Sequence, residues 1–203
     1  EEYLKNKEYF VCNITTNGIR DNRKCTNHLP YHKKGYINIG YIGIRDFHKG
    51  YWILCDAGKI LNDKNYKFQI SLYGDEFDIP AVYDSFCKGY GLFKHERLTD
   101  IMRTIDILVV PGYCNETFGF SCLEAVANGV PVLVSSHTGG KDLLTGSEMP
   151  YLFEPNAGDL AVLLEQYLRM PELLDKKRSE QQELQITFSM KQHVEQLLSR
   201  IVP

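Results

Sequence analysis

Two carboxylates, Glu116 and Glu124, lie eight positions apart with Gly119 between them. If both lay in one helix, they would be about 12 Å apart and roughly 80° out of phase. That is too far for a pair that shares a proton or flanks one bond, which needs about 5–10 Å. The spacing favours Glu116 in a loop and Glu124 two turns into a helix, in contact with two parts of one elongated ligand. An exposed loop glutamate and a first-turn glutamate favoured by the helix dipole would show the same spacing.

The segments around these glutamates predict the phosphate-binding edge of a parallel sheet. An apolar run at 107–111 precedes Glu116, and a second apolar run at 130–134 follows the helical segment. Strand, glycine-containing turn, helix and strand in this order place a helix N-terminus at the carboxyl edge of the sheet, where backbone amides bind phosphate. A nucleotide sugar fits such an edge, because it has hydroxyls at both ends and a diphosphate between them.

The chain alternates between apolar strand-like runs and helical segments. We expect strands at 37–42, 67–73, 89–93, 106–110, 131–135 and 151–153, and helices at about 50–62, 78–87, 96–104, 118–128 and 139–145. Strands that are rich in Ile, Leu and Val on both faces are typical of a buried parallel sheet. The alternation predicts an α/β fold with a Rossmann-like, doubly wound parallel sheet flanked by helices. A helical C-terminal tail is expected over 157–200, broken near Pro171 and near 187–189.

Length and composition fit one globular domain. The 203 residues are 43% hydrophobic and 24% charged, with a net charge of −3. This chain can bury a full core, and its charge gives no field that would favour nucleic acid or an anionic membrane. We divide it into an N-terminal segment and polar loop at 1–36 and a nucleotide-sugar-binding domain at 37–203. The start at Glu1 rather than Met indicates a piece of a longer protein, and no apolar run reaches the ~18 residues of a transmembrane helix.

The cysteines and histidines show no metal-binding pattern. Cys55, Cys87 and Cys122 fall in apolar helical patterns, so we expect small buried side chains in a reducing compartment. Cys114 lies two residues before Glu116, at a ligand edge where a thiol could be reactive. The run at 175–178, Asp-Lys-Lys-Arg, is typical of a solvated helix face.

Several further segments, in order, resemble the retaining GT-B glycosyltransferases of family 4, the glycosyl transferases group 1. The Glu-x7-Glu pattern has Phe-Gly shortly after its first glutamate and Ala directly after its second. The other matching segments are Tyr41-Ile-Gly43 with Lys49-Gly50, Ser71-Leu-Tyr-Gly74-Asp75, Gly89-Tyr-Gly91-Leu-Phe93, Met102 to Pro111, Ala127-Asn-Gly129-Val-Pro131-Val and Thr138-Gly-Gly140-Lys-Asp142. Each segment alone is weak, but the ordered set is specific and runs from about Asn17 to the C-terminus.

The resemblance implies a role for each part of the donor site. Glu116 would hold hydroxyls of the transferred sugar, Glu124 would accept hydrogen bonds from the ribose, and Phe93 would offer backbone groups to the base. The backbone amides that would meet the sugar and the diphosphate are those of Phe118, Gly119 and Phe120. Three other positions have structural interpretations: Thr117 and Asp142 as helix caps, and His95 as a surface or capping residue.

The loop after the first strand would bind the diphosphate. Gly43 lets the backbone approach a phosphate, and Lys49 would place an ammonium on a phosphate oxygen. The family normally has an arginine directly after the glycine, but here Ile44 holds that place and Arg45 follows it. From there Arg45 could reach the diphosphate or point to solvent. Cations aimed at the leaving diphosphate can replace a metal, so we expect no metal and no cofactor besides the nucleotide-sugar substrate.

By this resemblance, the chain is the donor-binding domain of a retaining, hexosyltransferase-like glycosyltransferase. It would move a sugar from a nucleoside-diphosphate sugar to a glycan or lipid-linked acceptor, with Glu116, Lys49 and Arg45 as the catalytic candidates. Its main partner would be a missing N-terminal acceptor domain, without which we expect no activity and on which a final helix at about 188–200 would pack. The resemblance also implies a cytoplasmic role in polysaccharide biosynthesis, with peripheral attachment at the inner face of the membrane.

Other functions remain open on the sequence. The departure at Ile44 is compatible with a non-catalytic nucleotide-binding or scaffold module. A sugar-nucleotide epimerase would share the GT-B fold, whereas a glycan phosphorylase would need a lysine for pyridoxal phosphate and a much larger chain. A flavodoxin-like receiver would need an acidic cluster at early strand ends, which Asp46 alone does not provide.

Overall fold

One fully parallel sheet forms the centre of the molecule. The computed structural model describes residues 35–116, 119–144, 147–148, 150–184, 194–195 and 198. Within them, six strands lie in the order β3-β2-β1-β4-β5-β6, and every neighbouring pair is parallel. The strands are β1 Ile37–Ile42, β2 Phe68–Tyr73, β3 Cys87–Gly89, β4 Ile107–Val110, β5 Val132–Ser135 and β6 Leu152–Phe153. The predicted α/β, doubly wound parallel sheet is confirmed.

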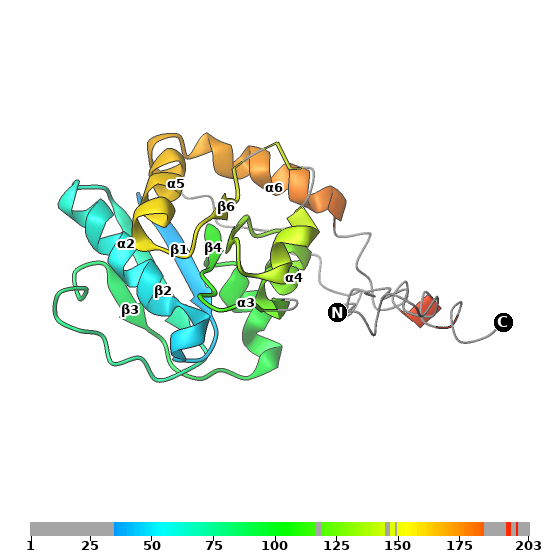
Figure 1. Cartoon of the computed structure of the whole chain (residues 1–203), viewed down its shortest axis with the longest axis horizontal. Coiled ribbons are helices and arrows are strands. Elements are labelled where there is room, and N and C mark those ends of the chain that lie inside the picture. Colours follow the sequence, from blue (N-terminus) through cyan, green and yellow to red (C-terminus); the bar gives the residue numbers. More distant parts are fainter. Residues whose placement is uncertain are drawn as a thin grey trace, which may run out of the picture.

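Helices cover both faces of this sheet (Figure 1). The α-helices are α2 Tyr51–Asp63, α3 Leu98–Met102, α4 Phe120–Ala127, α5 Ala157–Arg169 and α6 Glu172–Leu184, and the 3-10 helices are η1 Phe47–Lys49, η2 His95–Arg97 and η3 Gly139–Leu144. Helices α2 and α5 pack together over one face, and α3 and α4 supply the core on the other. Helix α6 follows α5 and contacts α4, so it joins the two helical layers.

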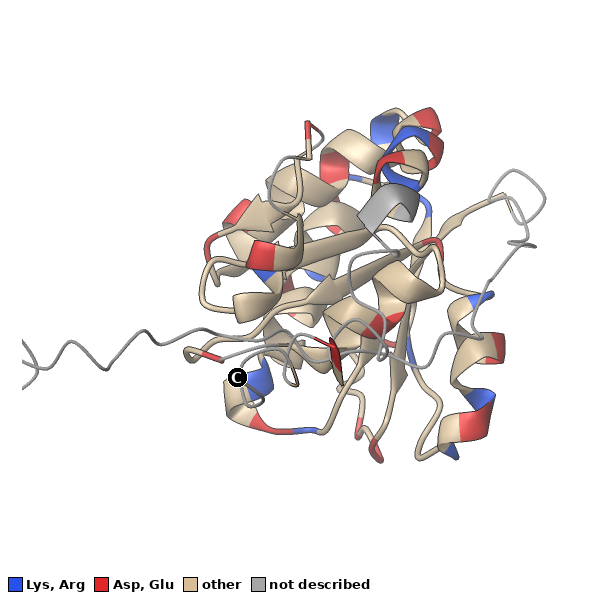
Figure 2. Ribbon diagram, turned by 90° about the vertical axis from the view of Figure 1, so that its right-hand side faces the viewer, with Lys and Arg blue, Asp and Glu red and all other residues tan. Residues whose placement is uncertain are grey.

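Strand β1 lies in the middle of the sheet and serves two cores. Because side chains alternate along a strand, Ile37, Ile39 and Tyr41 face α2 and α5. Gly40 faces the other core, where an added Cβ atom would lie 2.5 Å from the Ile105 side chain. A residue without a side chain is therefore needed here for that core to close on the sheet. In the view of Figure 2, positions of Lys and Arg alternate with positions of Asp and Glu along the ribbon.

The segment 78–87 differs from the prediction of a helix. Ile79, Tyr83 and Phe86 have the apolar spacing of a helix, and all three pack against the α2 core. They do so from consecutive turns, in which the amide of Tyr83 bonds to Pro80 and that of Phe86 to Tyr83. Cys87 then opens β3 by pairing with Ile70, so it is a strand residue and not a helical one. The predicted strand at 89–93 is therefore displaced to Cys87–Gly89.

The predicted solvated face at 175–178 is wrong for Lys177. Its side chain is 0% exposed, and its Nζ atom has no hydrogen-bond partner and lies 5.2 Å from the centre of the Tyr151 ring. Burial is the main reason that the pKa of Lys177 is lowered to about 8. Leu174, Lys177 and Gln181 are three to four residues apart and all buried, so they form the inward face of α6.

Several expectations at the chain ends and loops have different outcomes. The helical tail is interrupted at Pro171, as predicted, because α5 ends at Arg169 and α6 begins at Glu172. The proposed break near 187–189 and most of the segments 1–36 and 188–200 lie outside the described residues. Within the described part, no helix has the length and apolar character to cross a membrane.

Candidate active site

The strand order creates a switch point between β1 and β4. From β1 the chain adds β2 and β3 on one side of the sheet, and β4, β5 and β6 then extend it on the other side. The loops after β1 and β4 leave this edge in opposite directions, and in α/β sheets such a position is the general site of a ligand crevice. Every segment that the sequence proposed for the donor site follows one of the strands at this edge.

Direct contacts hold the two switch-point loops together. The backbone amide of Tyr113 donates a hydrogen bond of 2.9 Å to the carbonyl of His48. Gly50 has φ 69°, and a Cβ atom added there would lie 2.0 Å from the carbonyl oxygen of Pro111. Gly50 is therefore required by its backbone conformation and by the close approach of the loop after β4.

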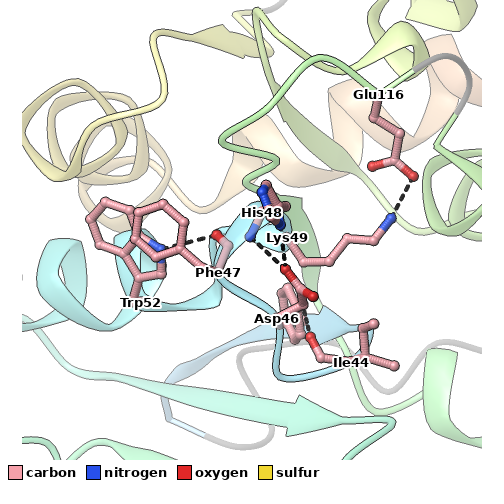
Figure 3. A network of polar contacts seen from close by, with 8 residues as sticks. Ile44, Asp46, Phe47, His48, Lys49, Trp52 and Glu116 are labelled. Atoms are coloured by element: carbon pink, nitrogen blue, oxygen red, sulfur yellow. Dashed lines mark hydrogen bonds and ion pairs between the residues drawn. The ribbon is translucent and has the colours of Figure 1, made fainter.

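Lys49 and Glu116 meet across the switch point (Figure 3). The Nζ atom of Lys49 lies 2.8 Å from Oε1 of Glu116, and their side chains are 40% and 27% exposed. The ammonium comes from the loop after β1 and the carboxylate from the loop after β4. Because both groups remain accessible, a bound molecule could take either one as a partner: an anion on the ammonium, a hydroxyl on the carboxylate. The sequence placed both residues at one site, and the structure brings them together.

A third loop fixes the backbone of Glu116. The amide of Glu116 donates to His137, and its carbonyl accepts from the amide of Gly139, at 2.9 and 2.8 Å. Beneath this contact, the buried Ser135 hydroxyl donates to the carbonyl of Gly112 and lies 3.2 Å from the Thr138 hydroxyl. These bonds determine where the Glu116 carboxylate can reach. The Thr138-Gly-Gly segment was the only sequence signal for this support.

The helix that carries Glu124 begins at Phe120, two residues after the predicted start at 118. Gly119, with φ 79°, is the residue before α4, and Phe120 is its first residue. A Cβ atom at Gly119 would lie 2.9 Å from the Thr138 side chain. Glu116 is therefore in a loop and Glu124 is in the helix, as the spacing favoured. Thr117 and Phe118, proposed as a helix cap and a ligand, lie outside the described residues.

On the other side of the crevice, η2 approaches α4. The Nδ1 atom of His95 lies 3.9 Å from Oε1 of Glu124. His95 is exposed, as the surface interpretation expected, but it also adjoins the proposed ribose ligand. Phe93 is half-buried, with its ring edge-on to Tyr73 at 6.4 Å between centres. His95 thus lies beside the predicted ribose ligand, whereas the ring contact of Phe93 is with Tyr73.

Arg45 turns to a different partner. Its backbone amide donates to Oδ2 of Asp75 at 2.7 Å. The amides of Arg45 and Glu76 lower the pKa of Asp75, and the Arg45 guanidinium adds to this effect. The side chain of Arg45 is exposed and forms no ion pair with Glu116. The contact of the Arg45 guanidinium with a bound diphosphate stays a prediction.

Gly43 links the loops after β1 and β2. Its amide donates to the carbonyl of Tyr73, and a Cβ atom on Gly74 would lie 2.8 Å from the Gly43 carbonyl oxygen. Asp142, in contrast, does not precede a helix as a cap would. It lies exposed within η3, the 3-10 helix that forms where a helix was predicted at 139–145. Among the described residues, no group of three or more His, Cys, Asp and Glu side chains could hold a metal ion.

The sequence matches a known family over most of its length. Residues 30–184 match the profile described as "Glycosyl transferases group 1". The chain belongs to the glycosyl transferases group 1 family. No curated protein sequence matches it significantly.

Solved structures share the fold of this group 1 domain. Sucrose-phosphate synthase from Thermosynechococcus elongatus has a TM-score of 0.71 at 21% identity, over 92% of this chain and 51% of that one. HepE from Anabaena, solved with UDP and glucose, has a TM-score of 0.71 at 18% identity, over 91% and 55%. The C-terminal domain of the group 1 protein LpcC from Francisella tularensis has a TM-score of 0.68 at 19% identity, over 84% and 97%. The chain thus spans about half the length of the first two.

Two features of this group 1 domain were not found by sequence reasoning. One is the contact of the Asp46 carboxylate with the His48 ring, 2.8 Å from Oδ1 to Nδ1. The other is a group of rings around Phe47, which includes Trp52 and Tyr113. The only sequence signal for the group of rings was the number of aromatic residues beside the proposed ligand loops.

Proposed function

We propose that this chain is the donor-binding domain of a retaining family 4 glycosyltransferase of the GT-B type. The observation that carries the proposal is the ion pair between Lys49 and Glu116 at the switch point. A cation and an acceptor group beside the crevice suit a ligand that has a phosphate next to a hydroxyl-rich ring. Glu124 lies further along, on α4, where a second set of hydroxyls would be met.

Each residue of the site then has a role toward a nucleoside-diphosphate sugar. Lys49 would neutralise the charge that builds on the diphosphate as the glycosidic bond breaks, and Glu116 would hold the sugar hydroxyls. Glu124 would accept from the ribose, and Phe93 would present its backbone to the base. The backbone groups proposed at the sugar and diphosphate are those of Gly43, Phe118, Gly119 and Phe120.

Arg45 needs a movement before it can contribute. Its guanidinium would have to leave the neighbourhood of Asp75 to reach a bound diphosphate. Lys49 therefore carries most of the charge stabilisation from this loop. We propose that no metal is needed, because the lysine and the start of α4 provide the positive potential.

The reaction would follow same-face attack, without a nucleophile from this chain. This half of the enzyme would act by position and charge. An N-terminal domain would bind the acceptor, a glycan or a lipid-linked saccharide, and the domain alone would be inactive. This chain aligns with only about half of the sucrose-phosphate synthase and HepE structures, which supports a division of the enzyme into two domains. WaaG, with a TM-score of 0.74 at 18% identity, is described as a glycosyltransferase of lipopolysaccharide biosynthesis. By analogy we propose a cytoplasmic role in polysaccharide synthesis, at the inner face of the membrane.

Calorimetric titration with UDP, GDP and ADP, in the presence of a chelator, tests the proposal. We expect one diphosphate to bind, and Glu124→Ala to weaken it by roughly 1–3 kcal/mol through loss of hydrogen bonds to the ribose. Lys49→Ala should weaken the diphosphate far more than the matching nucleoside. Glu172→Ala and Lys67→Ala change exposed residues outside the site and serve as controls.

The alternative is a nucleotide-binding or scaffold module that has lost transfer chemistry. Ile44 favours it, because an exposed isoleucine stands where a second diphosphate cation was expected. Nucleotide binding that is unaffected by Lys49→Ala would support this alternative. Absence of binding by all three diphosphates would remove the donor role from the isolated chain.

A further inference from the structure

Three aromatic side chains, two exposed and one half-buried, form a group beside the Lys49–Glu116 pair. We call Phe47, Trp52 and Tyr113 the ring cluster. The Phe47 and Trp52 rings are stacked at 5.3 Å between centres, and Tyr113 meets Phe47 edge-on at 5.1 Å. Tyr113 belongs to the loop after β4 and Phe47 to the loop after β1, so the cluster spans the same switch point as the ion pair.

The cluster is held in place although much of it is exposed. Phe47 is 58% and Tyr113 39% exposed. The indole Nε1–H of Trp52 donates to the carbonyl of Phe47, which fixes the stacked pair (Figure 3). Both ring-bearing loops are also tied by the Tyr113–His48 backbone bond. Fixed, exposed aromatic rings add little to a folded core, but they are well suited to bind a ligand with an apolar face.

A polar pair adjoins the rings. The Asp46 carboxylate accepts from the His48 amide and lies 2.8 Å from Nδ1 of the His48 ring. These two hydrogen bonds lower the pKa of Asp46, so it stays ionised. In the neutral form of the ring, an ionised carboxylate at Nδ1 favours the tautomer with the proton there, which leaves Nε2 as an acceptor. Figure 3 shows the imidazole between the stacked rings and the Lys49–Glu116 pair.

These groups match the chemistry of a sugar ring. A pyranose has an apolar face of C–H groups, which packs on an aromatic ring, and a rim of hydroxyls, which donate to groups such as an imidazole nitrogen. We propose that the ring cluster and the Asp46–His48 pair form a saccharide subsite, through which this chain contacts one sugar of the acceptor that the proposed N-terminal domain binds. The identification of the ligand as the acceptor rests on the proposed function.

The position favours a saccharide over other occupants. In a transfer reaction the acceptor hydroxyl must lie next to the sugar that Glu116 holds, and the ring cluster shares its two loops with Glu116 and Lys49. His48 would contact the acceptor through Nε2. Asp46 would be a positioning residue, because it acts on the ligand only through the orientation and tautomer of His48.

Saturation-transfer NMR on this chain without nucleotide tests the subsite. The probes are the methyl α-glycosides of glucose, galactose and mannose, and N-acetylglucosamine. We expect transfer to the C–H protons of at least one probe. Phe47→Leu keeps an apolar side chain but removes the ring, and it should weaken binding by about two- to tenfold. Tyr36→Ala removes a ring of matching exposure, 38%, before the amino end of β1, and it should leave binding unchanged. No transfer to any probe, or equal transfer in Phe47→Leu, overturns the proposal.

A second measurement tests the role of Asp46. In Asp46→Asn the amide can donate to Nδ1, so the proton should move to Nε2, which 15N spectra of the imidazole detect. NMR saturation transfer from the protein to the saccharide should then fall as much as in His48→Ala. A change of tautomer with undiminished saturation transfer to the saccharide would contradict the role of His48.

Other occupants of the surface have their own signatures. Self-association that Phe47→Leu abolishes, without saccharide transfer, would assign the cluster to a protein contact. Binding to phosphatidylglycerol vesicles with the same dependence would assign it to a membrane. Either result overturns the proposal. If no nucleotide binds but saturation transfer to a saccharide is still seen, the donor role is removed and a saccharide-binding surface remains. The two proposals therefore fail separately.

Discussion

The ammonium of Lys49 and the carboxylate of Glu116 lie 2.8 Å apart, although they come from loops 67 residues apart in the chain. Each group keeps unused donors or acceptors for a ligand, but the carboxylate already neutralises part of the ammonium's charge. Glu116 therefore competes with a bound phosphate for Lys49.

Glu116→Gln tests this competition. Removal of the carboxylate charge should tighten the binding of a nucleoside diphosphate by about two- to fivefold, the effect of an exposed ion pair. The same change should reduce the additional affinity that the sugar gives to a nucleotide sugar, because Gln is a weaker acceptor for hydroxyls. Calorimetry with both ligands measures the two effects. Weaker binding of both would mean that Glu116 supports the diphosphate and does not oppose it.

Gly50→Ala should separate the two switch-point loops. The new methyl group would lie 2.0 Å from the carbonyl oxygen of Pro111, and alanine is disfavoured at φ 69°. We expect a loss of about 3 kcal/mol or more in the free energy of unfolding in urea. Gly35→Ala is a matched control, because Gly35 has φ 74° but no atom within 4 Å of an added Cβ. It should lose only about 1–2 kcal/mol. Equal losses in the two variants would show that the contact with Pro111 is unimportant.

Lys177→Met should stabilise the fold at neutral pH. The folded-state pKa of Lys177 is about 8, below its ordinary value of 10.5, so the unfolded chain holds this proton more tightly. This difference reduces the free energy of unfolding by its full amount below pH 8. The reduction shrinks between pH 8 and 10.5 and is absent above pH 10.5. By linkage it is about 3 kcal/mol, which the variant should recover at pH 7.

Urea unfolding at pH 7 and pH 10 provides the measurement for this lysine. Between pH 7 and pH 10 the free energy of unfolding of the wild type should gain a contribution from Lys177. The Lys177→Met variant should lack this contribution. Lys176→Met changes the exposed neighbour on the same helix and should have little effect. A destabilised Lys177→Met at pH 7 would mean that the contact with Tyr151 outweighs the burial of the charge.

Glu165 should make the fold sensitive to acid. Hydrogen bonds from Lys64 and Tyr66 are the main reason that its pKa is lowered to about 2. Since the folded-state pKa lies below the unfolded value, Glu165 contributes stability above about pH 4.5 and loses it as the pH falls toward 2. Glu165→Gln should flatten this part of the acid-unfolding curve, measured by circular dichroism. Glu172→Gln, an exposed glutamate, is the control, and identical curves for the three proteins would contradict the assignment.

Much of this architecture could be predicted because it depends on local patterns. The run at β4 is apolar on both faces, so it indicates a buried parallel strand. The spacing of Glu116 and Glu124 separates a loop from a helix. The meeting of Glu116 with Lys49 follows from topology, because the carboxyl ends of neighbouring parallel strands share one edge.

Other features depend on contacts that the sequence does not encode locally. The turns at 78–87 have the same apolar spacing as a helix, and only the pairing of Cys87 with Ile70 decides between them. Lys177 lies in a charged run, and its burial arises from the crossing of α6 over α4. The ring cluster depends on the path of two loops from distant parts of the chain.

Trp52 is the one tryptophan of the chain, and it lies in the ring cluster at the switch point. Emission excited at the red edge of indole absorption therefore comes from this position alone. Its wavelength and intensity report on the solvent around the two loops, and the 13 tyrosines can transfer excitation energy to it. The protein thus contains a built-in optical probe at its candidate site, which can follow ligand exchange and loop separation in real time without a label.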